Sequence, residues 1–170
     1  MRKKDQLDHS ETEEQIISGI KHYWQVGIAD VGKPYRGGYC LVDPDGRLIA
    51  WLRVFSRKHL TNGLRLDARR LIEVTPFVSA SGRPLVIVVQ VSGRLSYVVW
   101  KPRVADFYPY VPTPDAGQTE YDFDWDAVIP VDNLKPMSHG LPQGLIGRTG
   151  SRQAAKHPRW RGVLEPPITT

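Results

Sequence analysis

Residues 38–58 read GYCLVDPDGRLIAWLRVFSRK, and this stretch predicts two β-strands joined by a tight turn. The turn falls at Asp43-Pro44-Asp45-Gly46, because Asp, Pro and Gly favour the backbone angles of a hairpin turn. Residues 48–55 form the clearest strand of the chain. Since strand side chains alternate, one face carries Ile49, Trp51, Arg53 and Phe55, and the other carries Leu48, Ala50, Leu52 and Val54. Both faces are largely apolar, so we expect an interior strand that is covered on both sides.

Helical patterns lie on either side of this hairpin. Ser10 and Glu13 have the spacing of a capping box, and apolar residues follow at helical intervals: Ile16, Ile17, Ile20, Tyr23 and Trp24. This helix is expected to close near Gly27. Asp67 is placed to cap a second helix, which we expect Pro76 to kink or end. Residues 84–91 and 95–100 then predict a second hairpin, and the whole order indicates the α/β class.

The composition of the chain changes near residue 105. Residues 1–104 hold the long apolar runs, so we expect them to form one α/β domain. Residues 105–170 are rich in Pro and Gly, with an acidic stretch at 115–126 and a basic stretch at 148–161. We therefore predict an extended, largely irregular C-terminal arm, which suits wrapping on a protein partner or folding back on the basic core.

The bulk properties limit the partners and the compartment. The 170 residues carry a net charge of +5, which permits nucleic acid or another polyanion as a partner. The single cysteine, Cys40, excludes an intrachain disulfide, and it has no neighbouring Cys/His pattern of a zinc site. No apolar run is long enough to cross a bilayer, and the N-terminal residues lack the apolar core of a signal peptide. We expect a soluble protein of the cytoplasm or another reducing intracellular compartment, with no membrane partner.

Three local stretches carry a resemblance to a known family. Residues 41–47 (LVDPDGR) are similar to a strand followed by a DG turn, residues 54–58 (VFSRK) to the end of the next strand and its basic loop, and residues 82–89 (GRPLVIVV) to a helix end followed by a buried strand. With the order of elements over residues 11–100, the chain resembles the archaeal-type Holliday junction resolvases of the PD-(D/E)XK nuclease superfamily. The resemblance implies a restriction-endonuclease-like core of helix, mixed central sheet and helix, and it implies a homodimer.

The same resemblance implies where a metal site would lie. Such nucleases hold a divalent metal between an aspartate on the first strand and an acid on the second, with a lysine two residues further on. In this chain those positions correspond to Cys40, Arg53 and Phe55. A guanidinium repels a cation and suits a phosphate, so Arg53 favours binding over cutting. The helix glutamate of the family corresponds to Glu11 or Glu14, which alone cannot hold a metal.

Three functions follow as hypotheses. The first is a nucleic-acid-binding protein, with DNA as the expected partner, which has lost metal-dependent cleavage and needs no cofactor. Its phosphate contacts would come from Lys33, Arg36, Arg53, Arg57, Lys58, His59, Arg148, Arg152, Lys156, Arg159 and Arg161. For any one of these side chains taken alone, a solvated surface charge is the favoured explanation.

The second hypothesis is an active Mg²⁺-dependent endonuclease with relocated acids. Its catalytic set would be Glu11, Asp43, Asp45 and Lys58, although Asp-x-Asp-Gly is also ordinary turn chemistry. The third hypothesis is a structural or assembly protein that uses the fold for docking. Its anchors would be the aromatic residues of the arm: Tyr108, Tyr110, Tyr121, Phe123, Trp125 and Trp160.

Overall fold

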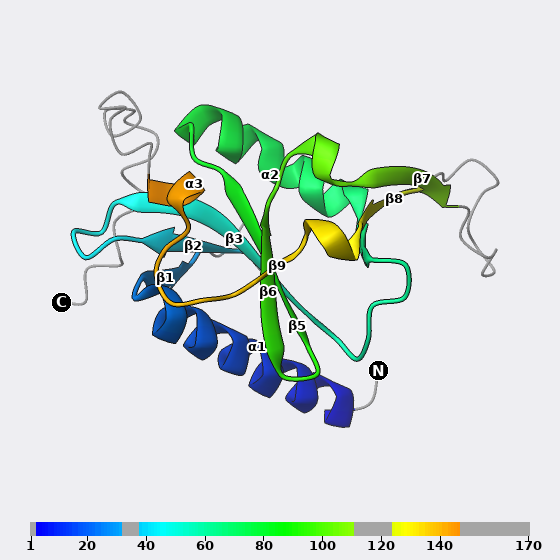
Figure 1. Ribbon diagram of the computed structural model, residues 1–170, viewed down its shortest axis with the longest axis horizontal. Coiled ribbons are helices and arrows are strands. Elements are labelled where there is room, and N and C mark those ends of the chain that lie inside the picture. The colour runs from blue at the N-terminus through cyan, green and yellow to red at the C-terminus, as the bar shows by residue number, and fades with distance from the viewer. Residues whose placement is uncertain (1–2, 32–37, 111–123, 147–170) are drawn as a thin grey trace.

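The computed structural model describes residues 3–31, 38–110 and 124–146, and it describes their side chains from Thr12 onward except at positions 110, 124 and 146 (Figure 1). The described residues form three α-helices: α1 (Lys3–Trp24), α2 (Ala68–Ser81) and the short α3 (Gln143–Ile146). The strands are β1 (Gly27–Asp30), β2 (Tyr39–Val42), β3 (Leu48–Arg57), β4 (Leu64–Asp67), β5 (Leu85–Val91), β6 (Arg94–Val99), β7 (Asp106–Tyr110), β8 (Asp124–Ile129) and β9 (Lys135–Pro136). Two 3₁₀ turns, η1 (Pro102–Val104) and η2 (Val131–Asn133), connect the later strands. No helix in these ranges is long and apolar enough to cross a membrane.

The central sheet has six strands in the order β1-β2-β3-β5-β6-β9. Strand β3 pairs antiparallel with β2 and parallel with β5, so the sheet is mixed. The parallel pairing arises because the crossover from β3 to β5 runs through β4 and α2, which returns the chain to the same end of the sheet. The predicted α/β class with a mixed central sheet between helices is therefore confirmed.

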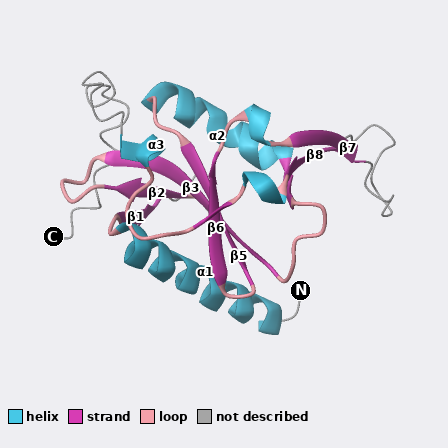
Figure 2. Ribbon diagram, viewed as in Figure 1, coloured by secondary structure: helices cyan, strands magenta, loops and turns pink. Residues whose placement is uncertain are grey.

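Helix α1 covers one face of this sheet (Figure 2). Its apolar stripe of Ile16, Ile20 and Trp24 packs against Leu52 of β3 and Val88 of β5, all nearly inaccessible to solvent. Gly19 allows the close approach, because a Cβ at this position would collide with the Leu95 side chain. We call this side of the sheet the α1 face.

The opposite side, the α2 face, is covered by α2 and by a second, three-stranded sheet of order β4-β8-β7. Leu71 and Val74 of α2 meet Trp51 of β3 in a core that Leu64 of β4 and Ile129 of β8 complete. The Trp51 indole donates a hydrogen bond of 2.9 Å to the buried Ser81 hydroxyl, which fixes the last turn of α2 against the sheet. The core on this face therefore includes strands from both halves of the chain.

Three predicted details need correction. Helix α1 begins at Lys3, about two turns before the predicted cap at Ser10. Helix α2 continues through Pro76 to Ser81, and the Thr75 hydroxyl donates to the Leu71 carbonyl in the turn before the proline. A β-bulge gives Ile49 no partner on β2, which exchanges the faces of Leu48 and Ile49 relative to strict alternation.

Part of the predicted arm contributes to the folded core. Strand β8 pairs with β4 across the predicted boundary, β9 pairs with β6, and Met137 and Leu145 are buried on the α1 face. The hairpin of β7 and β8 extends away from the central sheet at one end of the molecule (Figure 2). The division of the chain at residue 104 stays a prediction.

Candidate nucleic-acid interface

The end of β3 brings an arginine out of the central sheet. Arg57 is the last residue of the strand, and its guanidinium lies over the Phe55 ring at 5.4 Å from the ring centre. It donates a hydrogen bond of 2.9 Å to the Ser56 carbonyl and a longer one of 3.5 Å to the Arg65 carbonyl of β4. The Arg57 side chain therefore reaches from β3 toward β4, and contacts with the Phe55 ring and two backbone carbonyls hold its guanidinium in place.

A second arginine of β3 lies beneath it. Arg53 is 6% exposed and borders a small pocket of about 110 Å³ between β3, β4 and the start of α2. The other residues around this pocket are Phe55, Leu66, Asp67, Arg70 and Leu71. The carboxylate of Asp67 caps the helix, accepting a hydrogen bond of 2.9 Å from the Arg69 backbone. The N-cap prediction for Asp67 is therefore confirmed, and its carboxylate also lies beside the arginines of this pocket.

The first turn of α2 adds further positive charge. All of its residues are described, none is acidic, and Arg69 and Arg70 follow directly on the cap. Cations at this end oppose the helix dipole, whose positive end also lies here. Burial, and to a smaller extent the positive charge of Arg70, lower the pKa of Arg57. The fold thus concentrates like charges at one place.

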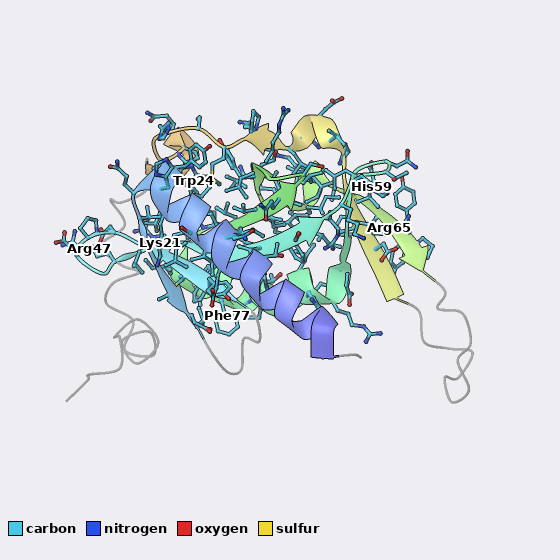
Figure 3. The ribbon with its side chains drawn as sticks, turned by 90° about the horizontal axis from the view of Figure 1, so that it is seen from below. Lys21, Trp24, Arg47, His59, Arg65 and Phe77 are labelled. Atoms are coloured by element: carbon cyan, nitrogen blue, oxygen red, sulfur yellow. The ribbon has the colours of Figure 1, made fainter. Side chains whose placement is uncertain are left out.

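Exposed basic residues surround these arginines. Lys58 and His59 follow β3 in the loop to β4, and Arg65 extends from β4 with an ion pair of 3.5 Å to Asp126 of β8. His59 and Arg65 lie on the same side of the molecule in Figure 3. This loop requires glycine at Gly63. A Cβ there would collide with the Ile129 backbone, and the φ of +107° is one that other residues rarely adopt. We call the group Arg53, Arg57, Lys58, His59, Arg65, Arg69 and Arg70 the basic end of β3.

The four residues of the predicted metal set are not brought together. Asp43 forms the β2–β3 turn, where its carboxylate accepts hydrogen bonds from the backbone of Asp45 at 2.9 Å and of Arg47 at 2.8 Å. Lys58 lies beyond the other end of the ten-residue β3, about 30 Å away at the rise of a strand. Figure 3 shows Arg47 of the turn and His59 at opposite ends of the molecule. Glu11 lies on α1, and its side chain is outside the described residues.

The positions that the resemblance implies for a metal are separated from the helix acids by the sheet. Cys40 packs in the core of the α2 face, where Arg53 and Phe55 also lie, and burial raises the pKa of its thiol. Glu13 of α1 lies on the α1 face, where it accepts a hydrogen bond from Tyr39; burial and this carboxylate raise the pKa of the Tyr39 hydroxyl. In the described ranges no three His, Cys, Asp or Glu side chains are grouped for a metal ion.

The structure extends the predicted binding set and leaves part of it outside. Arg53, Arg57, Lys58 and His59 lie together as described above. Lys33, Arg36 and the basic residues Arg148, Arg152, Lys156, Arg159 and Arg161 fall outside the described residues. Arg65, Arg69 and Arg70 are additions. In the sequence, Arg69 and Arg70 could have been recognised as a pair of arginines close after the predicted N-cap, where acidic residues are usual.

Comparisons with known proteins give a structural likeness. No protein-family model and no curated protein sequence matches the chain. Among solved structures, the chain is similar to Hjc, a Holliday junction resolvase from Archaeoglobus fulgidus, with 12% sequence identity and a TM-score of 0.41. The likeness covers 68% of this chain and 87% of the resolvase. At this identity no residue role passes from one chain to the other, so the interface stands on its own geometry.

Proposed function

We propose that this protein binds duplex or branched DNA through its phosphates at the basic end of β3, and that it does not cleave it by a metal-dependent mechanism. The observation that carries the proposal is the pocket that Arg53 and Arg70 line together, with the Arg57 guanidinium held over the Phe55 ring of the same pocket. A phosphate placed here would interact favourably with several guanidinium groups at once, and arginine is well suited to bind phosphate. The positive end of the α2 dipole adds to the attraction for the same anion.

The shape of the surface favours a polyanion over a small ligand. The pocket of about 110 Å³ is well below the roughly 300–1,000 Å³ of small-molecule sites. The exposed cations instead surround it on three elements: the loop after β3, strand β4 and the first turn of α2. Contacts of this kind position a nucleic-acid backbone and carry little sequence information. We therefore expect affinity to depend strongly on salt and weakly on sequence.

The absence of cleavage is proposed from the roles of the acids. The Asp43 carboxylate accepts hydrogen bonds within the β2–β3 turn, and the Asp67 carboxylate caps α2. The Glu13 carboxylate accepts a hydrogen bond from the Tyr39 hydroxyl. These carboxylates lie on different elements and on different faces of the sheet. A hydrolytic metal needs several hard oxygen ligands converging on one point. This arrangement supports binding without hydrolysis.

A binding titration tests the proposal. Fluorescence anisotropy would follow a labelled duplex and a labelled four-way junction between about 50 and 200 mM salt for the wild type and for Arg57→Ala/Arg70→Ala. If both arginines contact phosphates, the double variant should weaken binding roughly 10- to 100-fold at low salt. The slope of log K against log salt should fall in magnitude by about 1.8.

The matched control is Lys21→Ala/Arg47→Ala, which removes the same charge from the side opposite His59 and Arg65 (Figure 3). It should leave affinity within about twofold, apart from the general loss of net charge. Equal losses in the two double variants would show that binding follows net charge and would contradict the proposed interface. Wild-type protein that binds neither DNA at 50 mM salt would overturn the function itself.

A second candidate function, docking to another protein, is favoured by one observation. Phe107, Tyr108 and Trp125 of the β7–β8 hairpin are 44%, 52% and 51% exposed. Exposed aromatic side chains grouped on one element are typical anchors of protein interfaces, and a second copy of this chain is one such partner. Sedimentation velocity of the wild type and of Tyr108→Ser/Trp125→Ser tests self-association. A monomer in both cases would exclude the second copy as the partner.

A further inference from the structure

We propose that a groove beside β6 is a second site, which binds a single strand of nucleic acid with an unpaired base against Trp100. The groove has a volume of about 840 Å³ and lies at the end of α2 opposite the basic end of β3. It is bordered by the last turn of α2, by β6 and η1, and by η2 and the start of α3. The inference stands independently of the proposed duplex interface, because none of its residues belongs to that interface.

The groove is formed by the way the chain leaves the edge of the sheet. Strand β9 pairs with β6 only at Ser96 and Tyr97, so the remainder of β6 has no strand on its outer side among the described residues. The outer wall is held in place by η2, where the Asn133 side chain donates a hydrogen bond of 2.9 Å to the Val104 carbonyl of η1. The volume is within the range of sites that enclose a ligand.

Positive charge dominates the lining of the groove. Four cationic residues border it: Arg83 after α2, Lys101 and Arg103 around η1, and Lys135 on β9. The lining contains one acidic residue, Asp132. Lys101, Arg103 and Lys135 are exposed, so their charged groups are available at the opening. A ligand with at least two negative charges fits this lining better than a neutral one.

Trp100 supplies an aromatic surface among these cations. Its backbone N–H donates a hydrogen bond of 2.7 Å to the Leu85 carbonyl, which holds the residue at the end of the β5–β6 ladder. Its ring meets Phe107 edge-on with 6.3 Å between ring centres, and the half-buried side chain also lines the groove. An aromatic ring beside phosphate-binding cations is the arrangement that binds single-stranded nucleic acid, in which bases are free to stack. A duplex does not offer such a base.

An acidic extended peptide would meet the same charges but gains little from the sheet edge. Beyond the part paired with β9, only Val98 and Val99 of β6 and the following residue, Trp100, remain along this edge. In an antiparallel ladder every second residue directs its backbone groups outward, and the Trp100 N–H points to β5. That leaves Val99 alone to pair with an added strand, which is too short an edge for strand addition. The observations therefore favour the nucleic acid.

The test uses the full chain and two labelled ligands, an oligothymidine of about twelve nucleotides and a mixed-sequence duplex of equal length. Lys101→Ala/Arg103→Ala should lower the affinity for the single strand about tenfold and leave the duplex within about twofold. Arg57→Ala/Arg70→Ala should do the reverse. Trp100→Leu should weaken single-strand binding at least threefold, and Trp100→Phe should restore most of it. Circular dichroism would confirm that each variant is folded.

Three outcomes would overturn the inference. Single-strand binding that is unchanged in Lys101→Ala/Arg103→Ala places the strand elsewhere. Equal losses of affinity for single strand and duplex in that variant would show that the groove contributes only to the net charge of the protein. A polyglutamate peptide that binds the wild type more tightly than oligothymidine, and that is lost in Lys101→Ala/Arg103→Ala, assigns the groove to an acidic protein partner. Failure of the duplex interface alone leaves the single-strand result to stand.

Discussion

The two faces of the central sheet use the same strand for different purposes. Toward α1, strand β3 presents Ala50, Leu52 and Val54, which pack with the helix in an apolar core. Toward α2 it presents Trp51, then Arg53 and Phe55 beside a pocket, so this face changes from core to charged surface along the strand. One face therefore stabilises the fold, and the other both stabilises it and presents charge.

The two faces also differ in which ionisable side chains they hold. A metal needs its acids on one side of the sheet, because residues at i and i+2 of a strand share a face. The α2 face holds Cys40, Arg53 and Phe55, while Glu13 of α1 lies across the sheet beside Tyr39. The charges that remain on the α2 face are predominantly positive. This distribution of charge supports the proposed binding of an anion at the α2 face.

Leu52→Ala should have the largest effect on stability. Leu52 has no exposed surface, and truncating such a side chain costs about 2–5 kcal/mol of unfolding free energy. Urea unfolding measures this loss, and anisotropy at a temperature where the variant is folded should give unchanged DNA affinity. A loss below about 1 kcal/mol would show that the α1 face is not a tightly packed core.

Arg53→Met should have the opposite profile. The substitution keeps an unbranched apolar chain in the pocket and removes the guanidinium, so the unfolding free energy should change less than in Leu52→Ala. DNA affinity should fall about threefold to tenfold, which corresponds to roughly 0.7–1.4 kcal/mol. The two variants of adjacent residues in β3 would then differ in effect: Leu52→Ala would lower stability, and Arg53→Met would lower DNA affinity. Unchanged DNA affinity in Arg53→Met would give Arg53 a purely structural role.

Asp67 divides its effects between the helix and the interface. Asp67→Ala should lower the unfolding free energy by about 1 kcal/mol, because the side-chain bond to the Arg69 backbone is lost. Asp67→Asn keeps a capping oxygen and removes the negative charge beside Arg53 and Arg70, so DNA affinity should rise about two- to fivefold. Lower affinity in the Asn variant would mean that the carboxylate orders the arginines for binding.

Tyr39→Phe should have the smallest effect, and it concerns the α1 face alone. Because the pKa of Tyr39 is raised in the folded protein, the neutral hydroxyl is favoured by folding. Its contribution to stability is complete below about pH 10, the pKa of an unfolded tyrosine, and is lost as the pH rises above it. Urea unfolding between pH 8 and 11 should show a smaller alkaline loss in Tyr39→Phe than in the wild type. Identical pH profiles would exclude this coupling, and Tyr108→Phe serves as the exposed control.

The sequence predicted the elements whose signals are local. Strand β3, the β5–β6 hairpin and the N-cap of α2 follow from alternation, an apolar run and one aspartate. The four-residue strands β1 and β4 and the two-residue β9 lack such a signal, because pairing partners far along the chain form them. The bulge at Ile49 is likewise a property of two paired strands, and single-strand alternation misses it.

Only part of the candidate site could be predicted, because some of its residues are close together in the sequence and others meet only in the fold. Arg57, Lys58 and His59 form a visible cluster in the sequence, and Arg53 stood out because the resemblance implied an acid at its position. Arg65 and Arg70 join them only because the crossover returns β4 and α2 to the end of β3. The groove at Trp100 combines residues 78–104 with residues 132–144, and no short stretch could have indicated it.

We propose that the chain holds DNA at the basic end of β3 without metal-dependent hydrolysis. One measurement tests both the binding of DNA and the absence of cleavage. A labelled four-way junction is incubated with excess protein and about 10 mM Mg²⁺ or Mn²⁺. The same samples are then run on native and denaturing gels. We predict a shifted complex whose strands remain intact, with or without chelator. Strand cleavage that requires the metal and disappears in Asp43→Asn or Asp45→Asn would contradict the account.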